Sequence, residues 1–251
     1  MAKATVQRTL GDRLRWKTAE VVGRREESAA AVTLVLDVPD WPGHLAGQHI
    51  DLRLTAEDGY STQRSYSIAS SPENKHLELT IQRLPDGEVS PYLADEVRPG
   101  DQLELRGPVG GWFVWRPEQT EPILLVAGGS GLVPLVSMIR SRESASSRAP
   151  FRLLYSLRSP ADGLYTNELR SNLSGVDVAH LYTREAPQGA KRPPCRIVPS
   201  DLVKNGWPPE LEPTCYVCGP TAFAEKASNY LLLLGHNSKR IRVERFGGSG
   251  K

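Results

Sequence analysis

Cysteine is scarce in this chain, and the scarcity excludes several kinds of protein. The 251 residues include only Cys195, Cys215 and Cys218. A small, odd number does not suit a disulfide framework and fits a reducing compartment. Cys215 and Cys218 have C-x-x-C spacing, but no second pair and no H-x-x-x-H follows, which argues against zinc. The plant-type iron–sulfur spacing is absent as well.

Charge of one sign and long apolar runs are also lacking. Lys and Arg number 31 against 29 Asp and Glu, so the balance favours neither nucleic acid nor an anionic membrane as a partner. Apolar runs such as 231–234 are far too short to span a bilayer, and residues 1–14 show no signal-peptide core. The histidines form no metal-binding cluster, and no nucleophile elbow is present. We expect a cytoplasmic protein without nucleic-acid binding, membrane insertion or a metal site.

What the first half does contain is the two-residue alternation of half-buried strands. The expected strands cover 31–38, 49–54, 65–68, 77–83 and 102–106. Turn dipeptides such as Asp58-Gly59 separate them. Several short strands at this spacing predict an antiparallel barrel or sandwich.

The second half has a different pattern. The apolar run 123–127 is typical of a strand buried on both faces. Further strands are expected at 151–157, 176–182, 215–217 and 241–246, and helices up to residue 140, at 167–173 and at 222–234. Strands alternating with helices predict a doubly wound parallel α/β sheet. A polar, proline-bearing segment at 115–122 places the boundary between domains 1–117 and 118–251, and 187–199 is expected to be a surface loop.

A glycine loop follows the first buried strand of this half and opens a helix. Gly129, Ser130 and Gly131 would let the backbone approach phosphates, and the free N–H groups of the helix start favour an anion. Pro134 stands where the fingerprint G-x-G-x-x-G has its third glycine, so the match is imperfect. The context predicts a nucleotide site, with a tight strand–helix turn as the alternative.

Basic residues follow the next two strands. An NAD site usually has an acidic residue at the end of the second strand, whereas Arg158 stands here, and Thr183 and Arg184 end the third strand. Two arginines at adjacent strand ends would suit the 2′-phosphate of NADPH. Each arginine taken alone is equally well explained as a solvated surface residue.

Cys218, Gly219 and Pro220 end a later parallel strand, where ligands of open sheets bind. A small thiol there would flank a flat ring without crowding it. The alternative is a buried cysteine followed by a proline that starts a helix. Alternation along the strand points Cys215 to the opposite face, where we expect a structural role.

Two motifs of the first half suit a ligand that is both aromatic and anionic. Alternation places Arg64 and Tyr66 on one strand face, and Ser65 and Ser67 on the other. Arg64 would pair with phosphate and Tyr66 would stack on a ring, unless the two are a surface arginine and a cross-strand tyrosine.

The segment from Gly87 through Glu88 and Val89 to Ser90 precedes a short helix expected near 92–96. Its N–H groups and the Ser90 hydroxyl would hold another phosphate. A turn at Asp86 and Gly87, with Ser90 as the helix N-cap, explains the same residues equally well.

Taken in this order, and ending in Glu244-Arg-Phe246-Gly247, the motifs resemble the ferredoxin–NADP reductase superfamily over residues 15–247. The resemblance implies an antiparallel FAD barrel followed by an NAD(P) domain. It implies that Arg64 pairs with the FAD pyrophosphate, that Tyr66 packs on the flavin and that Ser67 lies near flavin N5. It implies a catalytic group of Ser67, Cys218, Glu244 and Phe246. The other cofactor-binding residues it implies are Ser65, Ile81, Arg83, Gly87, Glu88, Val89, Ser90, Gly129, Ser130, Gly131, Pro134, Arg158, Thr183, Arg184, Gly219 and Pro220.

The function implied is an FAD-dependent NAD(P)H reductase that passes electrons to a separate protein. Candidate acceptors are a ferredoxin, a flavodoxin, a haem protein or the oxygenase or metalloenzyme component of a larger system. The residues favour NADPH over NADH and leave the direction open. Two departures stand out: no iron–sulfur or haem domain is fused, and Phe246 is followed by five residues where plant-type members end in an aromatic. The alternatives are a non-catalytic nucleotide-binding subunit and a thiol–disulfide enzyme using Cys215 and Cys218.

Overall fold

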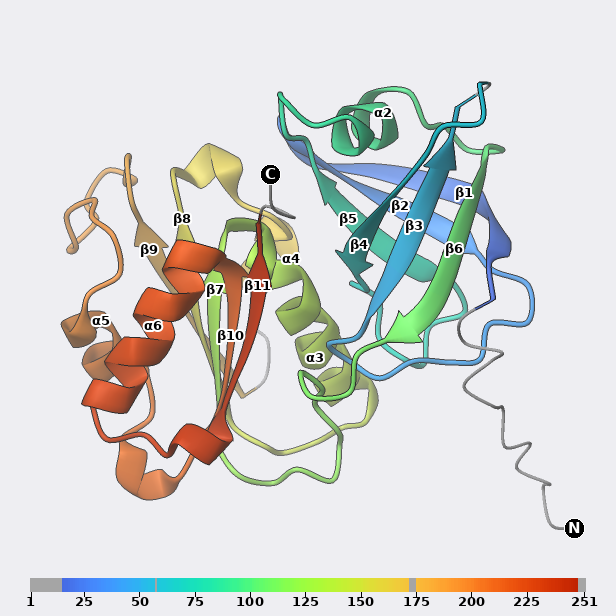
Figure 1. Ribbon diagram of the computed structural model, residues 1–251. Helices are drawn as coiled ribbons and strands as arrows, with labels where there is room; N and C mark the ends of the chain where they lie inside the picture. The colour runs from blue at the N-terminus through green and yellow to red at the C-terminus, as the bar shows by residue number, and fades with distance from the viewer. Residues whose placement is uncertain (1–14, 57, 172–174, 248–251) are drawn as a thin grey trace, which may run out of the picture.

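A computed structural model describes residues 15–56, 58–171 and 175–247 of the chain. Two sheets lie side by side, an antiparallel one from the first half of the chain and a parallel one from the second (Figure 1). The fold class predicted from the sequence is therefore confirmed. None of the helices in the described ranges combines the length and apolar character needed to cross a bilayer.

The elements follow one another along the chain in two groups. The first sheet is built from β1 (Lys17–Ser28), β2 (Ala31–Asp37), β3 (His49–Thr55), β4 (Ser61–Ser67), β5 (Leu77–Gln82) and β6 (Gln102–Val109), with α2 (Val89–Asp95) after β5. The second is built from β7 (Ile123–Gly128), β8 (Phe151–Leu157), β9 (Val176–Tyr182), β10 (Thr214–Pro220) and β11 (Ile241–Phe246). Its helices are η1 (Gly129–Gly131), α3 (Leu132–Ser144), η2 (Pro160–Asp162), α4 (Thr166–Arg170), α5 (Pro199–Asn205), η3 (Pro209–Leu211), α6 (Thr221–Leu233) and η4 (Ser238–Arg240).

The antiparallel sheet curls into a barrel. Its strand order is β4-β3-β6-β1-β2-β5, and a bridge between Ile68 and Leu79 joins the two ends. Alternation gives the sheet one apolar face, so that residues such as Ile50 and Leu52 of β3 point into the barrel and are fully buried. Burying one apolar face of every strand gives this domain its own core.

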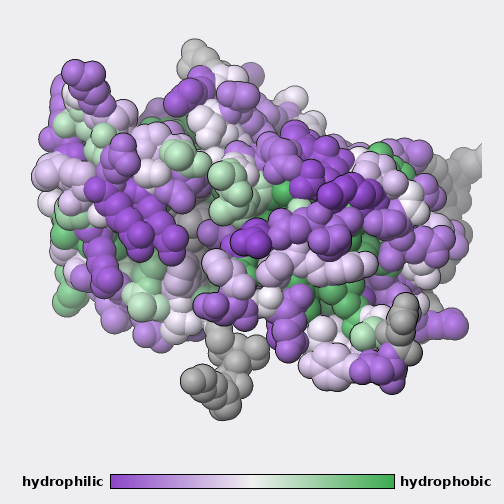
Figure 2. Space-filling view, turned by 90° about the horizontal axis from the view of Figure 1, so that it is seen from above, coloured by the Kyte–Doolittle hydropathy of each residue, from purple (hydrophilic) through white to green (hydrophobic). Residues whose placement is uncertain are grey.

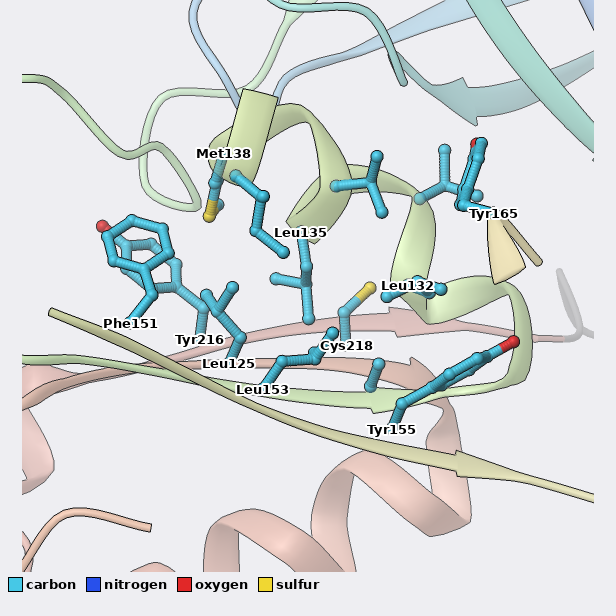
Figure 3. Packing of buried hydrophobic residues seen from close by; sticks show 14 of the residues in the cluster. Leu125, Leu132, Leu135, Met138, Phe151, Leu153, Tyr155, Tyr165, Tyr216 and Cys218 are labelled. Carbon is cyan, nitrogen blue, oxygen red and sulfur yellow. The ribbon is translucent and has the colours of Figure 1, made fainter. Parts of the chain in front are cut away.

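The parallel sheet has the order β11-β10-β7-β8-β9, with β7 and β10 at its centre. Every residue of β7 is buried, as expected for a strand covered on both faces. In Figure 1, α3 and α4 cover the face toward the barrel, and α5 and α6 cover the other face. Figure 3 shows Leu132, Leu135 and Met138 of α3 packed over this first face.

Charged residues join the two domains. Arg140 on α3 donates to Glu78 of β5 at 2.8 Å and to Glu168 of α4 at 2.6 Å. It also donates to the carbonyl of Ala69 at 3.0 Å. Burial would raise the pKa of Glu78, but Arg140 and Arg25 hold it below its ordinary value. The arginine therefore binds carboxylates of both domains.

Hydroxyl groups continue the same contact. The Tyr165 hydroxyl is hydrogen-bonded to Thr80 of the barrel, and the Tyr165 backbone N–H donates to Glu27 at 3.1 Å. Ser137 on α3 donates to the carbonyl of Ser70 at 2.7 Å. We call this contact the interdomain seam, defined by Glu27, Ser70, Glu78, Thr80, Ser137, Arg140, Tyr165 and Glu168.

Three features of the fold differ from expectation. The strand β1 was not predicted, because its residues are largely polar and include a glycine. The helix α5 was not predicted; it begins at Pro199, the last residue of the expected loop. The helix α2 begins earlier than expected, at Val89. Residues 1–14, which bear on the expected location, lie outside the described ranges.

Candidate functional site

A cavity of about 610 Å³ lies between the barrel and the second domain, and we call it the cleft. Its walls are formed by Asp51, Gln63, Arg64, Ser65, Tyr66, Ser67, Thr80, Gln82, Leu84, Gly87, Glu88, Val89, Ser90, Ser130, Val133, Arg245, Phe246 and Gly247. The structure thus brings together residues predicted from four distant motifs. Figure 2 shows this end of the molecule from above as mostly hydrophilic, with apolar residues in small separate groups.

Strand β4 lines one wall. The Arg64 guanidinium donates to the Thr62 hydroxyl at 3.0 Å and to the Gln63 carbonyl at 2.7 Å, and no described carboxylate pairs with it. Burial raises the pKa of Tyr66 to about 12, so the phenol stays neutral. The Ser67 hydroxyl is buried without a hydrogen-bond partner among the described residues. The strand therefore offers a cation that is not in an ion pair with any described residue, a neutral aromatic ring and a hydroxyl without a hydrogen-bond partner.

The start of α2 lines the second wall. The N-cap residue is Glu88, which makes no side-chain cap, so the interpretation of Ser90 as the N-cap is wrong. The Ser90 hydroxyl instead accepts a hydrogen bond from the backbone of Leu84 at 3.1 Å, which closes the loop. A Cβ on Gly87 would lie 3.0 Å from the Ser90 hydroxyl, so glycine permits this tight loop. The first N–H groups of the helix are free for a ligand.

The glycine loop after β7 reaches the cleft at Ser130. Gly129 has φ +55° and nothing within 4 Å of where a Cβ would be, which leaves room for a ligand. Gly131 differs, because a Cβ there would lie 2.2 Å from the Cys218 carbonyl. Packing of Gly131 against β10 therefore leaves no room for a side chain. Pro134 lies in the first turn of α3, where a missing N–H costs nothing.

The predicted arginines Arg158 and Arg184 lie beside each other just beyond the carboxyl ends of β8 and β9, and neither lines the cleft. The Arg184 N–H donates to the Arg158 carbonyl at 2.9 Å, and that of Thr183 donates to Leu157 at 2.9 Å. Both arginine side chains are exposed. Within the described part of the chain, neither guanidinium has a hydrogen bond or ion pair.

The cysteines of the C-x-x-C motif lie on opposite faces of β10. Cys218 is fully buried and its sulfur points toward α3 (Figure 3), whereas Cys215 packs on the side of α6. Burial raises the pKa of Cys215 to about 12, and burial and Glu244 raise that of Cys218 well above its usual range. Both are neutral, free thiols. A thiol–disulfide enzyme using this pair is therefore excluded.

Gly219 and Pro220 carry β10 into α6. A Cβ on Gly219, which has φ +152°, would lie 2.9 Å from the Gly128 carbonyl. Pro220 is the N-cap residue of α6. Neither lines the cleft.

Strand β11 brings Glu244 and Phe246 to the barrel. Phe246 lines the cleft, and Glu244 lies 3.6 Å from His49, measured from Oε1 to Nδ1. Burial raises the pKa of Glu244 to about 7, and its Oε2 has no hydrogen-bond partner among the described residues. His49 was not predicted, since a single histidine in a strand gives no signal by itself.

Two barrel residues implied by the resemblance, Ile81 and Arg83, also lie outside the cleft. Ile81 is fully buried in the barrel core. Arg83 is paired with Asp95 of α2 at 2.6 Å. By contrast, Thr80, Gln82 and Leu84 line the cleft and were missed. Their two-residue spacing along β5 and just beyond places them on one face, which was the available signal.

The residues in and beside the cleft suit a flavin nucleotide, because some of their buried polar atoms have no partner among the described residues. Buried polar atoms normally have partners, so the lone Ser67 hydroxyl and Glu244 oxygen indicate groups that a ligand satisfies. Tyr66 and Phe246 offer aromatic surface for a flat ring. Arg64 and the start of α2 offer positive charge for phosphates. Within the described ranges, no cluster of His, Cys, Asp or Glu fits a metal ion.

Family models match both halves of the chain. An oxidoreductase FAD-binding domain matches residues 19–114, and an oxidoreductase NAD-binding domain matches residues 125–229. The glycine betaine monooxygenase reductase subunit of Pseudomonas aeruginosa is 31% identical over 205 residues, covering 80% of this chain and 56% of that protein. Methane monooxygenase component C of Methylosinus trichosporium is 35% identical over 160 residues, covering 64% of this chain and 44% of that protein.

A solved structure matches nearly end to end. The flavohem-like FAD/NAD-binding domain of a nitric oxide dioxygenase from Vibrio cholerae has a TM-score of 0.76 and 26% identity. The match covers 92% of this chain and 99% of that domain. The chain spans about half the length of the curated relatives it matches.

Proposed function

The chain belongs to the ferredoxin reductase superfamily and is an FAD-binding NAD(P)H oxidoreductase, and from this premise we propose that it supplies electrons to the oxygenase component of a multicomponent system. The similarity to reductase subunits of two monooxygenases supports this acceptor class. The observation that carries the proposal is the cleft itself, where the unpaired Ser67 hydroxyl and aromatic rings of two domains, Tyr66 and Phe246, face one space.

We assign the FAD contacts to the barrel side. Arg64 would pair with the pyrophosphate, as would the N–H groups of Glu88, Val89 and Ser90, whereas that of Gly87 already donates to the Leu84 carbonyl at 2.9 Å. Tyr66 and Phe246 would hold the isoalloxazine ring, and the Ser67 hydroxyl would bond to its polar edge. Bound FAD supplies the ability to take two electrons as hydride and to release them one at a time.

The second domain would hold the pyridine nucleotide. Gly129 and Ser130 lie at the start of α3, where free N–H groups favour phosphate. Arg158 and Arg184, exposed and unpaired in the described structure, would bind the 2′-phosphate of NADPH. Glu244 and Cys218, neighbours in the register of β10 and β11, would border the nicotinamide. The chain's contribution is orientation and exclusion of water.

Two further assignments complete the proposal. We place the boundary between the domains after residue 117, within the segment 110–122 that joins β6 to β7. We place the protein in the cytoplasm, since all three cysteines are free thiols and suit a reducing compartment.

The first experiment is a visible spectrum of the purified protein, followed by NADPH or NADH without oxygen. Flavin bands that bleach would support the cofactor and the hydride step, and the faster nucleotide is the preferred one. Flavin that never bleaches would favour the alternative of a non-catalytic binding subunit. A protein that stays colourless after FAD is added would overturn the assignment of the cleft.

Nucleotide preference has its own test. Arg184→Ala should raise KM for NADPH much more than KM for NADH, because only NADPH has the 2′-phosphate. Arg148→Ala, an exposed arginine beyond the end of α3, is the control. Equal effects of Arg184→Ala on both nucleotides would contradict the assignment.

A further inference from the structure

The loop 183–198, which runs from β9 to α5 in Figure 1, is held by one of its own arginines. Arg192 donates from Nε to Asp201 Oδ1 at 2.7 Å and from Nη2 to Asp201 Oδ2 at 2.8 Å. Its Nη1 donates to the Tyr182 carbonyl at 3.1 Å, and its Nη2 also donates to the Cys195 carbonyl at 3.1 Å. One guanidinium thus joins the end of β9, the loop itself and the first turn of α5. We call the ion pair of Arg192 and Asp201 the clasp.

Asp201 anchors the clasp to a rigid part of the domain. Its side chain is only 8% exposed, and its Oδ2 also accepts the Val198 N–H at 3.0 Å, at the start of α5. Ile197 and Leu202, on either side, are buried in the core on the α6 side of the sheet. A bidentate pair of an arginine and a carboxylate has a defined orientation. The carboxylate therefore fixes Arg192, and with it the loop, relative to the sheet.

The end of β9 is held from both sides. Toward β8, the backbone N–H of Arg184 donates to the Arg158 carbonyl at 2.9 Å. On the outer side of β9, which is the last strand of the sheet, the Tyr182 carbonyl accepts from Arg192 and, at 3.1 Å, from the Cys195 N–H. Arg184 is two residues beyond Tyr182, so fixing the Tyr182 carbonyl limits where the Arg184 side chain can reach. The clasp therefore bears directly on the position of Arg184.

The three arginines at this place differ in how their charges are used. The guanidinium groups of Arg158 and Arg184 are exposed and have no hydrogen bond or ion pair within the described ranges. All three side-chain nitrogens of Arg192 are bonded to protein oxygens, so it could bind a ligand only by giving up these bonds. Two of the arginines are thus available to an anion, and the third determines the shape of the loop.

We propose that the clasp sets the preference for NADPH over NADH by holding Arg184 where the 2′-phosphate binds. The inference rests on the proposed function, in which Arg158 and Arg184 bind that phosphate. Asp201 and Arg192 act through Arg184 and are positioning residues. A loop that is already ordered binds without the entropic cost of ordering it. When the clasp is broken, this cost falls on NADPH alone, because NADH has no phosphate for Arg184 to bind.

The composition of the loop agrees with a fixed shape. Pro193 and Pro194 directly follow Arg192 and restrict the backbone there. At the tip of the loop, the Ala190 N–H donates to the Pro187 carbonyl at 3.1 Å and closes a turn. Proline lowers the conformational entropy of a chain before it is ordered. The prolines and the clasp therefore favour the same ordered loop.

Calorimetric titration of the FAD-loaded protein with NADP⁺ and with NAD⁺ tests the proposal without turnover. Asp201→Asn should weaken NADP⁺ binding about tenfold and leave NAD⁺ binding unchanged, because the amide has lost the charge and one of the two acceptor oxygens. Arg192→Lys should weaken NADP⁺ binding to a similar degree, since one ammonium group keeps the charge but cannot reproduce the fork. Equal weakening of both nucleotides by Asp201→Asn, or full NADP⁺ affinity in Arg192→Lys, would overturn the proposal.

The matched control is Asp177→Asn. Asp177 of β9 faces Arg152 of β8 at 3.5 Å, so this variant removes an aspartate–arginine pair at the other end of the same two strands. It should change the affinity for neither nucleotide. A loss of NADP⁺ affinity as large as that of Asp201→Asn would mean that any weakening of β9 has this effect, and the proposal would fail.

A double variant separates positioning from a general loss of structure. If the clasp acts through Arg184, adding Asp201→Asn to Arg184→Ala should weaken NADP⁺ binding no further. Additive losses would contradict the proposal. An Arg184→Ala protein that binds NADP⁺ as tightly as wild type would instead contradict the nucleotide assignment of the proposed function.

Hydrogen exchange of the wild-type protein keeps the proposal testable even if Asp201→Asn does not fold. The Cys195 N–H donates to the Tyr182 carbonyl, so it exchanges only when the loop leaves β9. Without nucleotide it should be protected to the same degree as with NADP⁺, because the clasp has already ordered the loop. Rapid exchange that NADP⁺ slows would show that the ligand, and not the clasp, orders the loop, and the proposal would be wrong.

Discussion

The two domains meet in two places that are built in opposite ways. In the interdomain seam, Arg140, Glu78, Thr80 and Tyr165 all have partners across the boundary. In and beside the cleft, the Ser67 hydroxyl and one Glu244 oxygen have none among the described residues. An unpaired buried polar group costs free energy, and a paired one does not. The seam therefore stabilises the folded chain, and the cleft keeps polar atoms ready for a ligand.

Arg140→Met breaks the seam and has the largest expected effect. It removes the cation that binds Glu168 and leaves Glu78 with Arg25 alone, and we expect a loss of about 3 kcal/mol in the free energy of unfolding. Urea unfolding measures it. Arg83→Met is the control, since it removes an ion pair whose partners are both 44% exposed and should cost less than about 1 kcal/mol. Similar losses for both variants would mean that the ion pairs of Arg140 stabilise the fold no more than the surface ion pair of Arg83.

Glu244→Gln tests the cleft side through pH. The folded-state pKa of about 7 lies above the ordinary 4.5, so the folded protein holds the proton more tightly. This contribution is complete below about pH 4.5 and is lost as pH rises through 7. Between pH 5 and pH 8 wild type should lose about 2 kcal/mol that Glu244→Gln keeps. Parallel stability curves for the two proteins would contradict the raised pKa.

Tyr165→Phe removes one hydroxyl from the seam. Thr80 keeps its hydrogen bond to Thr33, so the expected loss is about 1 kcal/mol. Tyr155→Phe is the matched variant, because the Tyr155 hydroxyl accepts a bond from Leu164 within one domain. Both should lower stability, but only Tyr165→Phe should make the link between the domains more sensitive to protease. Equal resistance of the two variants to protease would show that the Tyr165 hydroxyl does not hold the domains together.

A pair of serines gives the smallest and most direct comparison. Ser137 of the seam donates to the Ser70 carbonyl, and Ser67 of the cleft has no partner. In FAD-free protein Ser137→Ala should cost about 1 kcal/mol, whereas Ser67→Ala should cost nothing or stabilise slightly. Adding FAD should reverse the result for Ser67→Ala alone. A loss for Ser67→Ala without FAD would mean that the hydroxyl has a protein partner.

The sequence predicted the fold class because each domain has a strong local period. Alternation in β2, β3 and β5 and the apolar run of β7 are signals that need no distant contact. Strand β1 was missed because pairing with β2 and β6, and not its own composition, makes it a strand.

The site residues divide in the same way, into those marked by a short local motif and those defined only by distant contacts. Arg64, Tyr66, Ser67 and Phe246 stood out in short motifs, and all four line the cleft. His49 gave no local signal, because its partner Glu244 lies on a strand far away in the sequence. Gly131 has two explanations, since its position in a motif predicted phosphate binding and its packing against Cys218 also requires a glycine.

The bond from the Tyr165 N–H to Glu27 spans 138 residues of chain. A ribosome adding about 5–20 residues per second takes on the order of 10 seconds to cover that distance. Within this interval the barrel is completed by β6 (Gln102–Val109), before the Tyr165 segment that binds Glu27 has been made. The charged residues on the barrel side of the interdomain seam, such as Glu27, thus keep this surface hydrated until the second domain covers it. Docking waits until α3 and the Tyr165 segment have left the exit tunnel.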